Sequence, residues 1–510
     1  MQAGGHKTMA TATRLAAETP KYFSLKHVIG FTLLLALLKI GPAAISAVSA
    51  LLCLWALTGR KQAIQALSLA VIIKHLNQSL YTYPGEFGVI AWLLLILAGL
   101  RIFLSASSRQ LKLILPLLAF STLVLLLMTV QDNRYPDVSA MKLFVFSYGA
   151  AALLVGYACV QDDEANELAT WIFSLMATVV LLSLPTLAFP AIGYTQFKGF
   201  HGILSHPQTF GPVLSPLVAW LLGGILFKKN SKLLAPAMAT LGLVALIILS
   251  EARTAVVAVL LSLASTFIVI FFKRRRFAGF RVGRTLGLAL AVVVALAIGM
   301  ASSSGIRQTL TGFVFKHQTK NLNLDDALSS RSGGVASQWH NFLNKPITGY
   351  GFGVYASGEF PSGVVRVMGI PISASVEKGF LPTAILEEVG LPGTLAFLYF
   401  IVGVARRVIG NGDPAWIAVF FACLFVNIGE MMFFSLGGIG LYFWLFLGLS
   451  TRMGKPGEAA ATISDRFAAS TSADLSRHPA QPLGIGRYAR EHACLAGGPP
   501  MRRRRPTLEA

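Results

Sequence analysis

The stretch KLLAPAMATLGLVALIILSEARTAVVAVLLSLASTFIVIFF, residues 232–272, decides the class of fold. Two apolar runs, roughly 232–250 and 254–272, each have about the length that a helix needs to cross a bilayer. Only the short polar run from Ser250 to Thr254 separates them, so Arg253 lies at the mouth of a membrane helix. A charge beside hydrocarbon is costly and is rarely kept without a partner.

Arg253 has two interpretations. A guanidinium presents a planar fork of donors to phosphate oxygens, so it suits an anion that arrives on a lipid. The alternative is an arginine that only extends its head to the membrane surface. The rest of the chain favours the first interpretation.

The composition predicts an all-α polytopic integral membrane protein. Of the 510 residues, 55% are hydrophobic and 13% are charged, whereas a soluble domain has about 25% charged residues. Lys39, Lys74 and His75 interrupt the first three apolar runs, so we expect about 12–14 transmembrane helices. The runs are 28–40, 42–58, 63–80, 86–104, 112–130, 140–160, 168–188, 209–227, 232–250, 254–272, 285–302, 382–404, 413–430 and 437–450.

The basic residues predict the orientation. The net charge of +21 comes largely from Lys and Arg in short loops, which marks the cytoplasmic side of a membrane protein and argues against nucleic acid as a partner. Both termini are then cytoplasmic, and residues 189–208 and 303–381 lie outside. The acidic loop 161–167 is the one short loop that does not fit this bias.

Four regions follow from this topology. Residues 1–27 form a cytoplasmic N-terminal segment, and 28–188 form an N-terminal transmembrane bundle. Residues 189–450 form a second membrane region, whose large outer loop, 303–381, is expected to carry short helices. Residues 451–510 are polar, end in a run of arginines, and are predicted to be a disordered basic cytoplasmic tail.

The first outer segment combines a cation with imidazoles at a membrane surface. Lys198, His201 and His206 lie among turn-forming Gly and Pro residues. The alternative is an ordinary loop whose histidines are solvated. The four cysteines lack the spacing of a metal site or a disulfide framework.

The long outer loop holds the other candidate residues. Arg331 is expected to open a helix in which Trp339 and Phe342 share one face. The glycines of 349–353 predict a tight backbone turn, because no strand precedes them and no Lys-Ser/Thr follows. Glu377 and Lys378 then lead into the next span.

Two carboxylates, Glu387 and Glu388, lie about one and a half turns inside that span. Carboxylates at such a depth need partners, and Arg or Lys on neighbouring spans are the expected ones.

Together these elements resemble the O-antigen ligase/polymerase family of membrane glycosyltransferases, over roughly 190–400. The matching elements are Lys198-Gly199 with His206-Pro207, where the family usually has Arg-Gly and Asn-Pro; Ser250-Glu-Ala-Arg253-Thr-Ala; Arg331, Trp339 and Pro346-Ile-Thr-Gly349-Tyr-Gly351; and Glu377-Lys378-Gly-Phe-Leu with Leu386-Glu-Glu-Val-Gly390. They run in the family's order.

The chain departs from the family pattern at the end of the loop. Ligases usually have His-Asn there, and that His is the proposed general base; this chain has Glu377-Lys378. His340-Asn341 has the matching letters but precedes the glycine turn, so we interpret it as a coincidence. The departure favours a polymerase or a related exopolysaccharide enzyme over a ligase.

The resemblance implies transfer of a glycan from an undecaprenyl-diphosphate carrier to an acceptor hydroxyl, glycan or lipid, on the outer face of a bacterial inner membrane. Cations fixed there would stabilise the departing diphosphate, and an inverting, metal-independent enzyme without a cofactor is expected. Other polysaccharide-assembly proteins are possible partners beside the lipid bilayer. The assigned residues are Arg253, Arg331 and Lys198 for the diphosphate, Glu377 and then His206 for the base, and His340, Lys378, Glu387 and Glu388 in support.

Two other classes of protein remain open. A transporter or flippase of lipid-linked oligosaccharides would use intramembrane charges such as Lys74, Glu388 and Glu430. Against it, the sequence has no internal repeat, and a transporter has less use for an outer loop of about 80 residues. The third class is a scaffold without chemistry.

Overall fold

Helices make up nearly all of the structure, a computed structural model that describes residues 22–195, 198–227, 234–273, 324–359, 362–375 and 378–454. For Thr195, Lys198 and residues 324–332, 362–363 and 373–375, only the backbone is described. All of these residues belong to one unit of the chain, Met1–Lys455.

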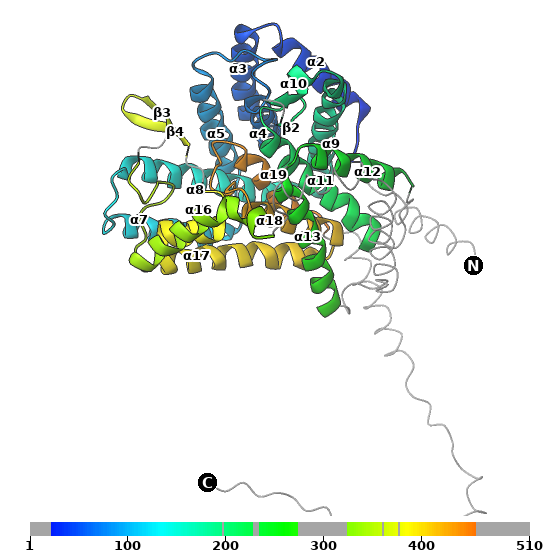
Figure 1. The fold of residues 1–510 in the computed structure, drawn as a ribbon. Coiled ribbons are helices and arrows are strands. Elements are labelled where there is room, and N and C mark those ends of the chain that lie inside the picture. The colour runs from blue at the N-terminus through cyan, green and yellow to red at the C-terminus, as the bar shows by residue number, and fades with distance from the viewer. Residues whose placement is uncertain are drawn as a thin grey trace, which may run out of the picture. The chain divides into compact units, whose positions relative to one another are not determined.

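Seven helical segments are long and apolar enough to cross a bilayer, which confirms an all-α, multi-pass membrane protein (Figure 1). Two of them join several elements: α6 (Ser108–Leu111), η1 (Lys112–Ile114) and α7 (Leu115–Met128) in one, α9 (Asp162–Ser183) and η2 (Leu184–Ala188) in the other. The remaining five are α5 (Phe87–Leu104), α8 (Pro136–Cys159), α11 (Pro207–Phe227), α13 (Arg253–Phe272) and α17 (Leu381–Asn411).

Shorter helices account for the other predicted runs that lie within the described residues. They are α2 (Leu25–Leu38), α3 (Pro42–Thr58), α4 (Arg60–Lys74), α12 (Leu234–Leu249), α18 (Pro414–Phe425) with η4 (Val426–Ile428), and α19 (Gly440–Arg452). The predicted run 285–302 lies outside the described residues.

The acidic segment 161–167 is not the predicted loop, because Gln161 caps α9 and residues 162–167 form its first turns. Ion pairs join this segment to basic residues at one end of the helices. Arg60 pairs with Glu164 at 3.0 Å, and Lys61 pairs with Glu167 at 2.5 Å. In the same segment, Arg452 pairs with Asp162, also at 2.5 Å. The acidic segment that does not fit the charge bias therefore neutralises basic residues of the predicted cytoplasmic side.

The two predicted outer segments lie at the other end. α8 runs from residues 131–135 to the start of α9, and Tyr135 just before α8 donates a hydrogen bond to the Gly358 carbonyl (3.2 Å). α4 likewise starts beside the first turns of α9, and after its last turn the backbone amide of Asn77 donates to the Ile203 carbonyl of the 189–208 segment (2.8 Å). Helix ends thus separate the predicted inner loops from the predicted outer ones.

The described part of the long outer loop, 324–359, 362–375 and 378–381, differs from the expected set of short helices. It holds a helix of 21 residues, α16 (Leu324–Asn344), followed by a hairpin of β3 (Ser362–Val367) and β4 (Ile370–Ser375). The prediction that Arg331 opens the helix is wrong: α16 begins at Leu324.

The orientation is tested by cysteine labelling of intact cells. A membrane-impermeant maleimide should modify Ser357→Cys in the outer loop and leave Asn166→Cys, exposed near the start of α9, unmodified, because the two positions lie at opposite helix ends. The buried Cys53, Cys159 and Cys423 should not react, and the variants also carry Cys494→Ser. Modification of the second variant alone would reverse the topology.

Candidate functional site

The candidate site lies at a break in the helical backbone of α17. At Gly390 the backbone is non-helical (φ 64°, ψ −173°), and Pro392 follows two residues later. Proline has no N–H, so the Glu388 carbonyl has no helical donor. The break also releases the Glu387 carbonyl and the Leu391 amide from the helical pattern. These polar groups need other partners at membrane depth.

The glycine turn 349–353 and Pro346 just before it supply those partners. The amides of Tyr350 and Gly351 donate to the carbonyls of Glu387 and Glu388 (2.9 and 3.0 Å), and the Leu391 amide donates to the Pro346 carbonyl (2.8 Å).

Gly349, Gly351 and Gly353 all have positive φ, which confirms the predicted tight turn. A Cβ atom on Gly349 would lie 2.5 Å from the Glu388 carbonyl, so the two backbones meet without room for a side chain.

Three charged side chains, Lys378, Glu387 and Glu388, form what we call the buried ion cluster. The Lys378 Nζ lies 2.8 Å from Glu387 Oε2 and 3.1 Å from Glu388 Oε1, and each side chain is at most 5% exposed. The second oxygens also have donors: Asn341 Nδ2 reaches Glu387 at 2.7 Å, and the Gly353 amide reaches Glu388 at 2.8 Å. Each of the four carboxylate oxygens of Glu387 and Glu388 therefore has a partner within the protein.

The partner of the two carboxylates is not the predicted one. We expected Arg or Lys from a neighbouring span, but the partner, Lys378, comes from the turn just before α17 itself. Burial lowers the pKa of Lys378, but attraction to Glu388 and Glu387 outweighs burial and raises it above its usual 10.5. On α8, Lys142 donates to the Gly353 carbonyl (2.8 Å) and interacts electrostatically with Glu388.

Helix α16 packs along α17 (Figure 1), and its Asn341 side chain donates to Glu387 of the cluster. Gln338 is buried; its amide donates to the Lys378 carbonyl at 2.7 Å, and its oxygen accepts from Thr383. His340, by contrast, is exposed. Arg331 lies on the same helix, seven residues or about two turns before Gln338.

A second contact joins the two earlier sequence elements. Gly199 has φ 54°, and a Cβ atom on it would lie 2.7 Å from the Ser250 carbonyl. Gly211 of α11 meets Ala252 in the same way. Arg253, half-buried, is the first residue of α13, directly after the tight turn that ends α12. The 198–211 and 250–253 elements are therefore neighbours.

The two histidines of the first outer segment have different surroundings. His206 is exposed, and its Nδ1 accepts from the Gln208 amide (3.1 Å) at the start of α11. His201 is buried, its Nδ1 lies 2.6 Å from the Leu204 carbonyl, and burial lowers its pKa. His201 thus holds the loop, and only His206 meets solvent.

Of the predicted site residues, the structure brings Lys378, Glu387 and Glu388 together. The structure also packs η4 against both α13 and α17. Of these helices, α13 begins at the candidate Arg253, and α17 begins three residues after the candidate Lys378. Glu377 lies outside the described residues, and for Lys198 and Arg331 only the backbone is described.

Sequence reasoning missed Lys142, Gln338 and the Gly353 amide. Gln338 and Asn341 are three residues apart on α16, so their spacing was a usable signal for a polar inner face.

Within the described ranges, no group of three or more His, Cys, Asp or Glu side chains is arranged to hold a metal ion. A scan of the chain against models of known protein families gave no match, and neither did a search of curated proteins.

Proposed function

We propose that the protein is a membrane glycosyltransferase that moves a glycan from an undecaprenyl-diphosphate carrier to an acceptor hydroxyl at the outer face of the membrane. The observation that supports this most is the pairing of sequence elements that lie far apart in the chain. The Gly199 element meets the Ser250 element, and the Gly349 turn meets Glu387 and Glu388.

In the proposed reaction, the acceptor oxygen attacks the anomeric carbon while the bond from that carbon to the diphosphate oxygen breaks. The acceptor proton passes to a base, for which Glu377 is the first candidate and His206 the second. Charge develops on the departing diphosphate, and Arg253, Arg331 and Lys198 are the proposed cations that stabilise it. A single displacement inverts the anomeric centre.

The buried ion cluster has a positioning role in this proposal. Its carboxylates are occupied by Lys378, Asn341 and the Gly353 amide, which leaves little for a substrate. Lys378 directly follows Glu377, so the cluster fixes the chain next to the proposed base. It also fixes α16, which carries Arg331.

A transporter of lipid-linked oligosaccharides is the second candidate, favoured by the same buried charges. The two proposals differ in what a purified protein should do. An enzyme converts a lipid-linked donor in detergent micelles, where no membrane separates two compartments. A transporter leaves the donor unchanged there.

Arg253→Ala should lower transfer about a hundredfold, as expected for loss of one group that stabilises transition-state charge. Arg253→Lys should be partly active at best, because lysine lacks the bidentate fork, and Arg331→Ala should resemble Arg253→Ala. Released undecaprenyl diphosphate is measured with purified protein, and Arg109→Ala, at an exposed arginine outside these elements, is the control. Unchanged turnover in Arg253→Ala would remove this residue from the site.

Glu377→Gln should bind the donor normally but lower transfer about a hundredfold, because the amide cannot accept the proton. Glu377→His should recover part of the activity, since it restores the residue usual in the family. Donor binding and turnover are measured separately. Near-normal turnover in Glu377→Gln, with loss in His206→Ala, would move the base to the imidazole.

A further inference from the structure

The β3–β4 hairpin lies against the start of two membrane-spanning helices. It packs on α8 and α5, and Arg366 of β3 pairs with Asp137 in the first turn of α8 at 2.7 Å. A second guanidinium nitrogen of Arg366 donates to the Gly369 carbonyl (2.8 Å). The hairpin is thus fixed at the level where α8 begins.

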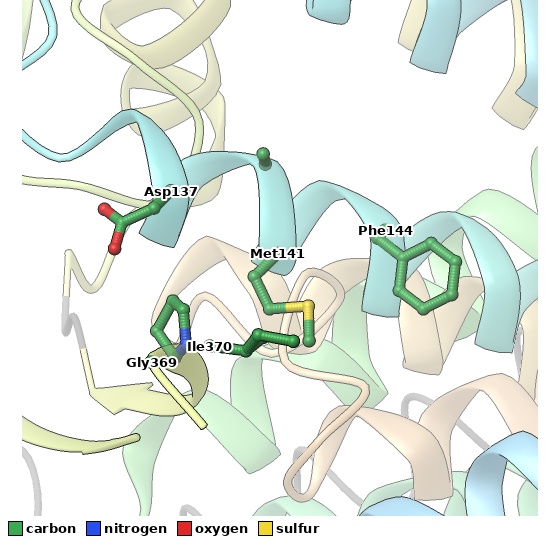
Figure 2. A pocket seen from close by; sticks show the side chains of 7 residues that line it. Asp137, Met141, Phe144, Gly369 and Ile370 are labelled. Atoms are coloured by element: carbon green, nitrogen blue, oxygen red, sulfur yellow. The ribbon is translucent and has the colours of Figure 1, made fainter. Parts of the chain in front are cut away.

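A pocket of about 370 Å³ lies between the hairpin and α8 (Figure 2). Its walls are mainly apolar, with Met141 and Phe144 on α8 and Ile370 and Pro371 on the hairpin, and Asp137 stands at one end. Figure 2 shows Met141 and Ile370 pointing toward each other across it. The pocket is shallow and open on one side.

The pocket opens onto the side of α8, a helix long and apolar enough to cross a bilayer. From Asp137 to Phe144, it extends about 10 Å along a helix that spans the membrane. Phe144 is 45% exposed on that helix and contacts the Trp92 ring of α5, and tryptophan is typical of the membrane–water interface. At the hairpin tip, Met368 is 98% exposed.

We propose that this pocket binds an anionic phospholipid of the surrounding bilayer. The hydrocarbon chain would lie along Met141 and Phe144, and the headgroup would meet Arg366. The guanidinium keeps donors in addition to those it uses for Asp137 and Gly369, because it has five. The site does not depend on the proposed glycosyl transfer.

The test uses two photoreactive phospholipids with a diazirine in the acyl chain, one with a phosphatidylglycerol headgroup and one with phosphatidylcholine. The full-length protein in nanodiscs should be labelled within 141–144 and 368–371. The anionic probe should give more label, by at most about fivefold, the attraction expected of one unpaired arginine near anionic lipid, because Asp137, which lines the pocket, offsets part of the charge of Arg366 beside it. Leu395 and Leu398, exposed on α17, report non-selective labelling.

A pair of matched variants identifies the headgroup contact. Arg366→Gln and Asp137→Asn break the same ion pair, but only the first removes the cation. The headgroup preference should disappear in Arg366→Gln and persist in Asp137→Asn. Equal labelling by both probes in the unmodified protein would overturn the proposal. So would labelling that undecaprenyl phosphate displaces and unlabelled phosphatidylglycerol does not, which would assign the pocket to a prenyl carrier.

Discussion

Replacing Lys378 with methionine is expected to lower the free energy of unfolding by about 3–5 kcal/mol, the cost of leaving buried charge without its partner. Two carboxylates, at most 5% exposed, would lose the ammonium that lies 2.8 and 3.1 Å away. Unfolding is measured by denaturant titration in one fixed detergent. A variant as stable as the unmodified protein would show that Glu387 and Glu388 do not depend on Lys378.

Two controls separate charge from packing. Lys61→Met breaks an ion pair whose carboxylate is 60% exposed, and it should cost at most about 1 kcal/mol. Adding Glu387→Gln and Glu388→Gln to Lys378→Met removes the uncompensated charge, so much of the stability should return.

The stabilisation from Lys378 should also depend on pH in one direction. Its folded-state pKa lies above the usual 10.5, so the contribution is complete below pH 10.5 and is lost as pH rises further.

Gly390→Ala is expected to destabilise the protein by about 3 kcal/mol or more, since two costs add. The backbone at this position, with φ 64° and ψ −173°, lies in a region that essentially only glycine adopts, and holding another residue there costs about 1–3 kcal/mol. The new Cβ atom would lie 2.3 Å from the Ile347 carbonyl oxygen, and such overpacking typically costs about 1–3 kcal/mol. The same denaturant titration measures the change.

Gly403→Ala is the matched control on the same helix. No atom lies within 4 Å of the position of its added Cβ, and alanine in a helix interior is favoured over glycine by about 1 kcal/mol. This variant should be as stable as the unmodified protein or more so. If Gly390→Ala were equally well tolerated, the contact of α17 with residues 346–347 would be looser than described.

The helices were predictable because membrane insertion depends on a local property, the length of an apolar run. Every predicted run within the described residues overlaps a helix. The demand of Glu387 and Glu388 for partners was predictable for a similar reason, since the cost of burying a carboxylate depends little on the rest of the fold. The tight turn at 349–353 followed from its glycines.

The partners themselves were not predictable. Lys378 and Asn341 meet Glu387 through the path of the outer loop, which no local pattern encodes, and the Gly353 amide is backbone without a side-chain signal. The β3–β4 hairpin was missed because Met368, at φ 50°, occupies a turn position where asparagine, aspartate or glycine is usual. Gly390 and Pro392 mark the break in α17. Both lie within one long apolar run, so the sequence predicts a single uninterrupted helix there.

The break at Gly390 also has a consequence for the order in which the protein assembles. Residues 346–351 leave the ribosome before residues 387–391, so the segment that satisfies the broken helix exists before the helix itself. Lateral release of α17 into lipid before that docking would carry unpaired carbonyl groups into hydrocarbon, at several kcal/mol for each group. Biogenesis of this span is therefore coupled to a loop made earlier, and a defect in the loop would appear as a failure of the helix to enter the membrane.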